Sequence, residues 1–432
     1  MRHFLSVVTV CLFLLTTLAD RAEADGIWRG GSMYSHFGVG LPNDFRSTYA
    51  DGMGVYGVAL HDNRIASIAN PAAWSRTVFT NASGAFEIRS FNAQYGSTQG
   101  NSTQFQAGPF QMVLPVSRDR FGVSFSVSPL TSSRYITENE YSLPPGQNHT
   151  GGELAYQIEN VGSGGINKIE VGFGYRITNS LSFGYAPSLL LGVIKRHQTI
   201  YFNNPDYRPV NLLETTSHYG FGNRLGIYYS RSDAFRSNDR AAFGATLSLP
   251  VAMVSEKRLE SRIDLRDVTI NPPSYYGDGN VTFPLEASAG FSYNLNPYLV
   301  ISSDVIYQNW EGYTNFNGQA ESFLNDRLRF GLGSQYIAAR RDVGSTFFSN
   351  FIYRIGVSYD TGNLTLHETD IETVTIHAGW GIPSSRTGSS IDFNVEYGFR
   401  GTEVSDLVSE RVFAFKITFN LSELMFEQRR LQ

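Results

Sequence analysis

The chain has 432 residues, with 34 Lys and Arg against 39 Asp and Glu and a formal net charge of −5. This weakly acidic balance gives no reason to expect nucleic acid as a partner. Charged residues make up only 17% of the chain and aromatic residues 14%, and no linker or low-complexity tract divides it. Beyond residue 24 there is no apolar run of roughly 18 residues, so the sequence predicts no membrane-spanning helix.

The N-terminus has the pattern of a secretory signal peptide. A basic start at residues 1–3 is followed by an apolar run at 4–19 and an A-x-A cleavage site at 22–24. We therefore expect residues 1–24 to be a Sec signal peptide, with a retained N-terminal anchor as the alternative. The only cysteine, Cys11, lies in this segment. The mature chain is expected to have no disulfide, no thiolate chemistry and no cysteine metal site.

Alternation of apolar and polar residues dominates the rest of the chain. Residues 391–400, IDFNVEYGFR, place apolar or aromatic side chains at every second position and Asp, Asn, Glu, Gly or Arg between them. Alternation with a period of two predicts β-strands. The same pattern predicts fourteen strands, at 84–96, 103–116, 120–136, 152–177, 181–202, 212–230, 239–262, 280–294, 299–311, 325–338, 348–362, 370–383, 390–401 and 408–421.

The length of these segments separates two β architectures. A soluble β-sandwich also alternates, but its strands are usually about 5–6 residues long. Longer segments suit tilted membrane strands of about 9–11 residues with extensions beyond the bilayer. Short connections also alternate with long ones, as in bacterial outer-membrane barrels. The short turns fall at 118–120, 178–180, 296–298 and 385–389, and the long loops near 143–151, 203–211, 263–279 and 312–324.

We therefore predict that residues 81–421 form an all-β, 14-stranded antiparallel transmembrane barrel. Because an even number of strands returns the chain to its starting side, both termini are expected in the periplasm. Within each strand one face is expected to meet lipid. In residues 281–294, for example, Val281, Phe283 and the apolar residues at every second position up to Tyr293 should share that face.

The opposite face, expected to line the lumen, carries many charges. Two interpretations are open. The charges can pair with one another and hold a plug in place, or Arg327, Arg329 or Arg354 can bind a substrate carboxylate by charge-assisted hydrogen bonds. The lumen-facing set comprises Glu170, Arg176, Glu286, Asp304, Arg327, Arg329, Arg354, Asp392, Glu396, Arg400 and Lys416.

Residues 25–80 do not alternate and are not expected in the barrel wall. Gly52, Gly54 and Gly57 are closely spaced, which lets the backbone pack tightly against another backbone. The Asn70-Pro71 pair, which Ala72 follows, predicts a fixed turn. A nucleotide-binding interpretation of the glycines is weak, because no strand precedes them.

These residues carry a resemblance to a known family. Segments 47–54, 58–62 and 70–72 resemble the N-terminal signature of the FadL/OmpP1/TodX family of outer-membrane hydrophobic-compound transporters. Residues 32–40, residues 397–401 and the Phe- and Arg-containing tail are similar to Bacteroidetes-type members. The resemblance implies a barrel whose lumen is plugged by an N-terminal hatch, here residues 25–80, and a periplasmic C-terminal tail at 422–432.

The resemblance also implies a transport route. Hydrophobic substrates such as long-chain fatty acids would be captured from outside, pass to a site in the lumen and leave through a lateral opening at a kink in the third strand. In this chain Ser128 and Pro129 are the candidates for that kink, because proline removes a ladder donor. The alternative is that Pro129 lies where the strand frays above the membrane.

Three non-enzymatic functions remain open: a hydrophobic-compound transporter, a passive porin, and a secretion-pathway or attachment component with the same fold. No metal-ligand spacing of His residues and no G-x-S-x-G motif occurs. A lumen-side His377 in a barrel-borne lipase is the one enzymatic alternative. We expect no catalytic residue, metal or cofactor, a monomer, and outer-membrane lipid and a hydrophobic small molecule as partners.

Overall fold

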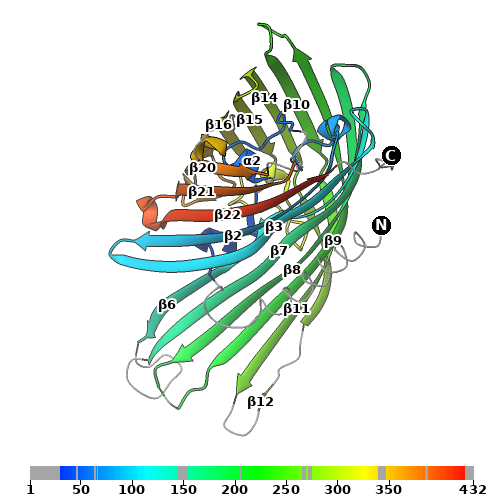
Figure 1. The fold of residues 1–432 in the computed structure, drawn as a ribbon. Coiled ribbons are helices and arrows are strands. Elements are labelled where there is room, and N and C mark those ends of the chain that lie inside the picture. Colours follow the sequence, from blue (N-terminus) through cyan, green and yellow to red (C-terminus); the bar gives the residue numbers. More distant parts are fainter. Residues whose placement is uncertain are drawn as a thin grey trace, which may run out of the picture.

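The computed structural model describes most of the chain and forms a barrel around an N-terminal plug (Figure 1). The predicted signal peptide and residues 424–432 of the predicted tail lie outside the described residues, as does part of the 385–389 turn. No described helix is long and apolar enough to cross a membrane. The described residues are 30–44, 47–62, 65, 67–144, 154–204, 206–264, 269–270, 275–338, 347–384 and 388–423.

The wall is an antiparallel sheet that closes where its first strand pairs with its last. Thr80 at the start of β2 pairs with Glu423 at the end of β22, so the wall begins and ends on the same side. The wall strands are β2 (Thr80–Tyr95), β3 (Thr98–Ser117), β4 (Phe121–Pro129), β6 (Tyr135–Leu143), β7 (Leu154–Arg176), β8 (Leu181–Phe202), β9 (Val210–Ser232), β10 (Arg240–Ser248), β11 (Val251–Asp264), β12 (Thr269–Ile270), β13 (Tyr275–Phe283), β14 (Glu286–Asn296), β15 (Leu299–Gln308), β16 (Arg327–Ile337), β17 (Ile352–Asp360), β20 (Thr373–Pro383), β21 (Ser390–Arg400) and β22 (Ser409–Glu423).

Within the described residues these strands make fourteen passes, which confirms the predicted number. The number of strands exceeds the number of passes because β4 and β6, β10 and β11, and β12 to β14 each belong to one pass. The interruptions fall at prolines, which cannot donate to a ladder. Pro129 ends β4, Pro250 separates β10 from β11, and Pro284 separates β13 from β14.

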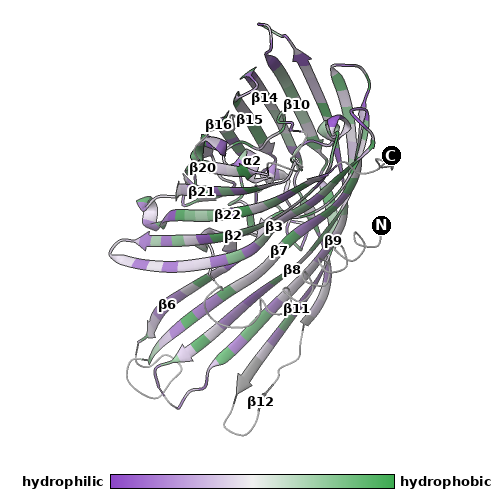
Figure 2. Ribbon diagram, in the orientation of Figure 1, coloured by the Kyte–Doolittle hydropathy of each residue, from purple (hydrophilic) through white to green (hydrophobic). Residues whose placement is uncertain are grey.

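The two faces of the wall follow the predicted alternation over most of its height. In β21, Asp392, Asn394 and Glu396 are buried while Ile391 and Tyr397 are exposed. Figure 2 shows the resulting alternation of hydrophobic and hydrophilic residues along the strands. Apolar side chains therefore face the bilayer and polar ones face the lumen, as in other transmembrane barrels.

The expectation of a single face across residues 281–294 is wrong. In β14, on the short-turn side of Pro284, the even-numbered residues Ser288 and Ser292 are buried. In β13, on the long-loop side of Pro284, the odd-numbered Val281 is buried. The neighbouring pass changes in the same way, since Thr246 is buried in β10 and Met253 in β11. A slip of one residue at each break moves every following side chain to the opposite face. Apolar residues therefore enter the lumen in this part of the barrel.

The plug consists of the described residues between 30 and 79. Its short elements are η1 (Met33–His36), β1 (Leu41–Pro42), α2 (Thr48–Asp51) and η2 (Pro71–Arg76). The hydroxyl of Ser47 caps α2 by accepting a bond from the backbone N–H of Ala50, at 3.3 Å. Irregular backbone of this kind is tolerated at membrane depth where it is buried in protein, as it is inside this barrel.

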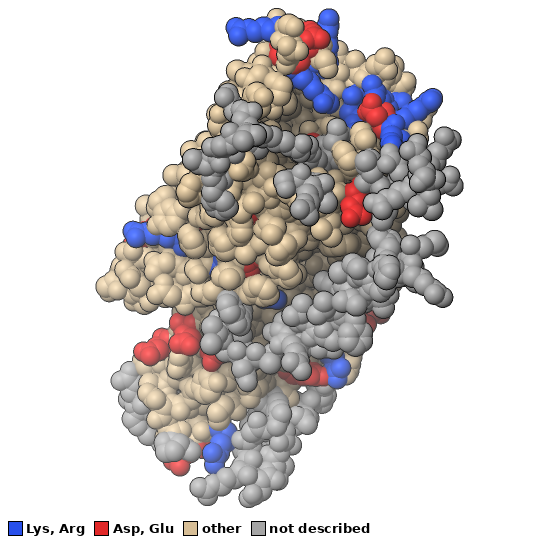
Figure 3. Space-filling model, in the orientation of Figure 1, with Lys and Arg blue, Asp and Glu red and all other residues tan. Residues whose placement is uncertain are grey.

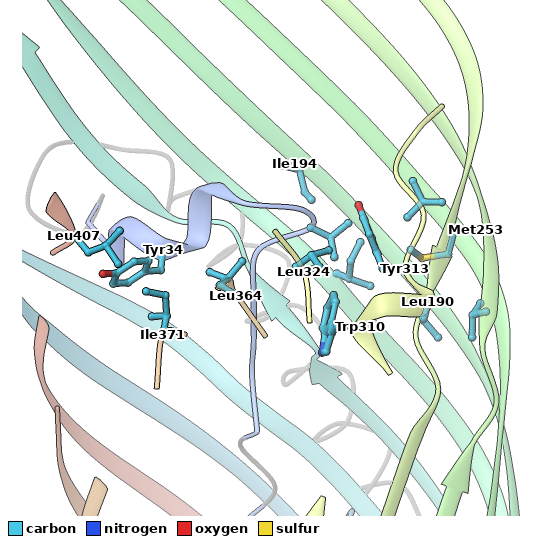
Figure 4. Close-up of a cluster of buried hydrophobic side chains, with 14 residues drawn as sticks. Tyr34, Leu190, Ile194, Met253, Trp310, Tyr313, Leu324, Leu364, Ile371 and Leu407 are labelled. Carbon is cyan, nitrogen blue, oxygen red and sulfur yellow. The ribbon is translucent and has the colours of Figure 1, made fainter. Parts of the chain in front are cut away.

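An apolar cluster closes the long-loop end of the barrel (Figure 4). Tyr34 of the plug packs in the same cluster as Leu190 and Ile194 of β8 and as Trp310 and Tyr313 of the 309–326 loop. This loop contains η3 (Trp310–Gly312), and the other loop elements are η4 (Phe347–Asn350), β18 (Thr365–Leu366), β19 (Thr369–Asp370) and η5 (Val404–Asp406). The 309–326 loop thus covers the mouth and packs onto the plug.

Candidate functional site

The six residues of the predicted hatch motif all lie inside the barrel, against the wall. The side-chain amide of Asn70 donates to the carbonyls of Val58 and of Ile227 in β9, at 3.0 and 2.9 Å. Its oxygen accepts from the N–H of Ala72, at 2.9 Å, at the start of the η2 turn that Pro71 opens. Asn70 therefore fixes the turn and fastens it to the wall at the same time.

The glycine-rich part of the motif packs against glycines of the wall. Gly54 has φ +67°, and a Cβ there would lie 2.8 Å from the His377 ring. On the wall, a Cβ at Gly356 would lie 1.9 Å from the carbonyl oxygen of Met53, and one at Gly333 would lie 2.0 Å from it. Neither contact leaves room for a side chain, so backbone meets backbone here.

The charges predicted to face the lumen hold the plug. Arg327 donates to Asp44 of the plug at 3.0 Å and to Asp360 of β17 at 2.9 Å. Lys416 lies 3.3 Å from Asp51 at the end of α2 and 2.7 Å from Glu396 of β21. The Lys416–Asp51 pair is buried and the Arg327 pairs are partly buried, and the partners come from both the plug and the wall.

Other predicted lumen charges bind the plug backbone or its neutral groups. The carboxylate of Asp304 accepts from the N–H of Gly57 at 2.7 Å, and that of Glu286 accepts from the Tyr56 hydroxyl at 2.6 Å. The first interpretation of the lumen charges, mutual pairing around a plug, describes these contacts.

The three arginines proposed for substrate binding have different surroundings. Arg354 is fully buried, donates to Asp392 at 2.7 Å and lies over the ring of Tyr49 at 5.2 Å. Arg327 is occupied by Asp44 and Asp360. Arg329 lies 3.8 Å from Asp44 and, with Arg327, lines a polar cavity of about 100 Å³ beside the plug.

His377 lies on the wall of the same small cavity. Its Nε2 is 2.9 Å from the Ser358 hydroxyl, and its Nδ1 is 3.4 Å from Glu396. Glu396 is also bonded to Lys416, and the cavity of about 100 Å³ has no space for an ester substrate next to the serine. His377, Ser358 and Glu396 therefore form part of the packing of the lumen. Among the described residues, no group of three His, Cys, Asp or Glu is placed to hold a metal ion.

The barrel wall is interrupted at the predicted kink. The β3–β4 ladder ends at Phe110 and Val127, and the β4–β7 ladder ends at Pro129 and Asn167. The segment between β4 and β6 keeps two backbone bonds to β7, from Leu130 to Ile166 at 2.8 Å and from Ser133 to Gly164 at 3.0 Å. Regular pairing with β7 resumes at Tyr135, the first residue of β6. Within the described chain no ladder joins β6 to β3, and Figure 1 shows the two strands diverging.

Between these strands the chain turns into the lumen. Residues Thr131–Ser132 form β5, which pairs with β1 of the plug. Two side-chain contacts cross the break: the Gln104 amide donates to the Ser132 hydroxyl at 3.2 Å, and Arg134 donates to the carbonyl of Phe105 at 3.1 Å. Ser128 and Pro129 therefore lie beside a break in the hydrogen bonding between β3 and the next pass of the wall, which side chains bridge and the plug covers.

A second cavity, of about 390 Å³, lies near this break and was not predicted from the sequence. One part of its lining is apolar and aromatic, with Phe37 of the plug, Ile194 of β8 and Phe316 and Phe323 of the 309–326 loop. The other part is charged, with Arg196, Lys257, Glu214 and Glu321. Pockets that combine apolar walls with a few placed polar groups are the usual form of small-molecule sites.

The cations of this amphipathic cavity share one carboxylate. Arg196 donates to Glu214 at 3.0 Å, and Lys257 donates to its other oxygen at 3.2 Å. Lys257 also lies 5.2 Å from the centre of the Phe316 ring. The Nε of Arg196 is buried without a hydrogen-bond acceptor, and its Nη2 donates to the plug carbonyls of Gly38 at 2.7 Å and His36 at 3.4 Å.

A histidine–tyrosine contact separates the amphipathic cavity from the break. His36 of η1 lines the cavity, and its ring packs edge-on against Tyr135 at 4.9 Å. Burial, followed by the charge of Arg196, lowers the pKa of His36. His36 is therefore neutral at pH 7. Its partner Tyr135 is the first residue of β6, directly after the break.

A family model covers almost the whole chain. The model of the BamG family matches residues 2–432. The chain belongs to the BamG family. A comparison with curated protein sequences gave no match.

This chain is similar in fold to solved structures of hydrocarbon channels and transporters. The "CymD monoaromatic hydrocarbon channel" matches with a TM-score of 0.56 and 14% identity over 89% of this chain and 98% of that chain. A Pseudomonas aeruginosa FadL homologue matches with a TM-score of 0.58 and 12% identity over 90% and 100%. The Ralstonia pickettii toluene transporter TbuX matches with a TM-score of 0.53 and 14% identity over 90% of this chain and 99% of that chain. The predicted FadL/TodX-type fold is confirmed, while the Bacteroidetes-type branch stays a prediction.

Proposed function

We propose that this BamG-family barrel binds hydrophobic compounds that carry an anionic head group, such as long-chain fatty acids, and conducts them across the outer membrane. The amphipathic cavity is the observation that carries the proposal. Its apolar wall suits a hydrocarbon chain, and Arg196 and Lys257 suit a carboxylate. The fold shared with a hydrocarbon channel and a toluene transporter supports the hydrophobic part of this cargo, and the carboxylate rests on the cavity alone.

The exit in this proposal is lateral. A ligand in the amphipathic cavity is one contact, His36 with Tyr135, from the break that begins at Pro129. Movement of these two rings would join the cavity to the break, and the ligand would then leave into the bilayer rather than pass the plug. The ion pairs that hold the plug favour this path, because a route through the plug would have to break several of them.

Binding is tested by removing the two cations. Arg196→Ala and Lys257→Ala are each expected to weaken binding of a fluorescent long-chain fatty acid roughly tenfold, because a hydrogen bond between charged groups is lost. Titration of the detergent-purified protein measures the affinity. Arg208→Ala, at an exposed loop arginine near the same end, should bind like the unmodified protein. Equal affinity in all three variants would reject the cavity as the site.

The lateral route is tested by closing the break with a cross-link. Cysteines replacing Gln104 and Ser132, whose side chains meet across it, should form a disulfide or accept a short dithiol linker. Uptake of labelled fatty acid by cells is expected to fall when the pair is oxidised and to recover on reduction. A pair at Ser90 and Thr103, which face each other on the intact β2–β3 ladder, is the matched control. Unchanged uptake in the oxidised Gln104–Ser132 pair would exclude this exit.

The plug favours a second candidate, a non-transporting component of a secretion or attachment pathway. Buried ion pairs from both wall and plug fix the hatch, and the cavity beside it is small and polar. A barrel with this role would carry no lipid ligand and would act through its surfaces. Absence of fatty-acid binding in the titration above would favour this candidate, and a passive porin is the less suited third because the plug fills the lumen.

A further inference from the structure

The end of the barrel where the short turns lie contains a cavity of about 590 Å³ lined by four arginines. Arg76 comes from η2 of the plug, Arg176 from the end of β7, Arg231 from the end of β9 and Arg240 from the start of β10. Figure 3 shows Lys and Arg side chains gathered at this end of the molecule. We name this cavity, with its four arginines, the arginine basin.

Nearby carboxylates do not balance these charges. Asp119 is the one acidic residue among the described residues that line the basin, and Arg176 already binds both its carboxylate and its carbonyl. Asp233 and Asp239 belong to the adjacent turn, where they accept bonds from backbone N–H groups. Among the described residues that line the basin, cations therefore outnumber anions.

The remaining contacts of the arginines are with neutral groups. Arg76 donates to the Ser182 hydroxyl at 3.2 Å, and its guanidinium lies 5.2 Å from the centre of the Tyr228 ring. Arg240 donates to the hydroxyls of Tyr228 and Ser230, at 3.4 and 3.3 Å. These neutral partners leave the positive charge of both arginines uncompensated.

The like charges affect one another. Arg231 is exposed, and no hydrogen bond or ion pair joins its side chain to any other described residue. Burial lowers the pKa of Arg76, and the neighbouring charges of Arg176 and Arg240 add to this effect. Guanidinium groups gathered around one cavity repel one another, and a bound anion would reduce this repulsion.

We propose that the arginine basin binds an acidic peptide segment of a partner protein, which presents Asp or Glu side chains to the guanidinium groups. Arginine forms bidentate bonds with carboxylates, so several arginines around one cavity suit a ligand with several carboxylates. A volume of about 590 Å³ exceeds the need of one inorganic anion. In the part of the lining that the structure describes, Val78 is the one apolar residue, so an acyl chain would find little to pack against.

The basin also faces the right compartment for such a partner. Arg76 and Arg240 point into the mouth of the lumen and not toward lipid, since they contact inward-facing residues of β8 and β9. Short turns of bacterial barrels lie on the periplasmic side. The segment therefore belongs to a periplasmic protein or domain, and the inference is independent of which proposed function holds.

The test measures binding of a fluorescein-labelled hexaglutamate peptide to the full detergent-purified chain by fluorescence anisotropy. Binding is expected at low salt and should weaken at high salt, because exposed charges are screened. Arg231→Glu and Arg240→Gln should each weaken it roughly tenfold or more. Arg231 is exposed, so its variant is expected to fold normally, and unchanged heat-induced unfolding verifies this.

The matched control is Arg258→Glu, at an exposed arginine on the long-loop side of β11. This variant should bind the peptide as the unmodified chain does. Absence of binding at low salt, or equal binding by the Arg231 and Arg240 variants, would overturn the proposal. Displacement of the peptide by inorganic phosphate at equal concentration would also overturn it and would assign a small-anion site instead.

Discussion

Replacing Arg354 by alanine is expected to destabilise the barrel by about 3–5 kcal/mol, because the buried carboxylate of Asp392 would lose its partner. Both side chains are fully inaccessible to solvent, and Arg354 also donates to Gln335 at 2.8 Å. Its guanidinium lies over Tyr49 of the plug, so the loss should loosen the plug as well as the wall. Heat- or urea-induced unfolding in detergent, followed by circular dichroism, measures the change.

The control for this prediction is an ion pair on the surface. Arg258 and Glu260 pair with side chains that are 53% and 36% exposed, so Arg258→Ala should cost about 1 kcal/mol or less. The double variant Arg354→Ala with Asp392→Ala should regain part of the stability, since no charge is then left buried alone. A loss in Arg354→Ala no larger than in Arg258→Ala would show that this pair does not hold the structure.

Leucine in place of Gly356 is expected to displace the plug and open the lumen. Even the first carbon of the side chain would lie 1.9 Å from the Met53 carbonyl oxygen, and the contact is with backbone that cannot rotate away. Overpacking a filled interior typically costs about 1–3 kcal/mol of stability. The plug can relieve this strain by moving away from β17. The barrel wall closes through its own ladder and should persist.

Ion conductance in planar bilayers measures this opening. The unmodified protein should be nearly silent, and Gly356→Leu should show steady conductance. Gly100→Leu is the control, because a Cβ at that wall position meets nothing within 4 Å. A silent Gly356→Leu protein with an intact barrel would mean that the plug tolerates the side chain, and the backbone contact would not explain the glycine.

The wall could be predicted from the sequence because its signal is local. Each strand alternates on its own, as in residues 391–400, and each short turn marks where two strands meet. The number of passes and the inward position of residues such as Arg354 and Lys416 followed from that pattern. A kink at Pro129 could be proposed by the same local reasoning, because a missing N–H donor has a local consequence, and β4 ends at this residue.

The amphipathic cavity could not be predicted in this way. It depends on the slips at Pro250 and Pro284, which bring Val281 into the lumen and leave no mark in the alternation itself. Arg196 and Lys257 lie on strands that a further strand separates, and they meet only through Glu214. The sequence instead offered Arg327, Arg329 and Arg354 as candidates because all three are inward-facing cations. Their partners come from distant plug and wall segments.

The most direct test of the proposed function is to identify, by mass, the lipid that co-purifies with the barrel. Lipid extracts of the purified unmodified protein and of an Arg196→Ala, Lys257→Ala double variant would be compared by mass spectrometry. We expect an amphipathic carboxylate near one per barrel in the unmodified protein and its depletion in the double variant. An extract without such a compound, or equal amounts in both proteins, would contradict transport through the amphipathic cavity and leave the secretion-pathway role as the better account.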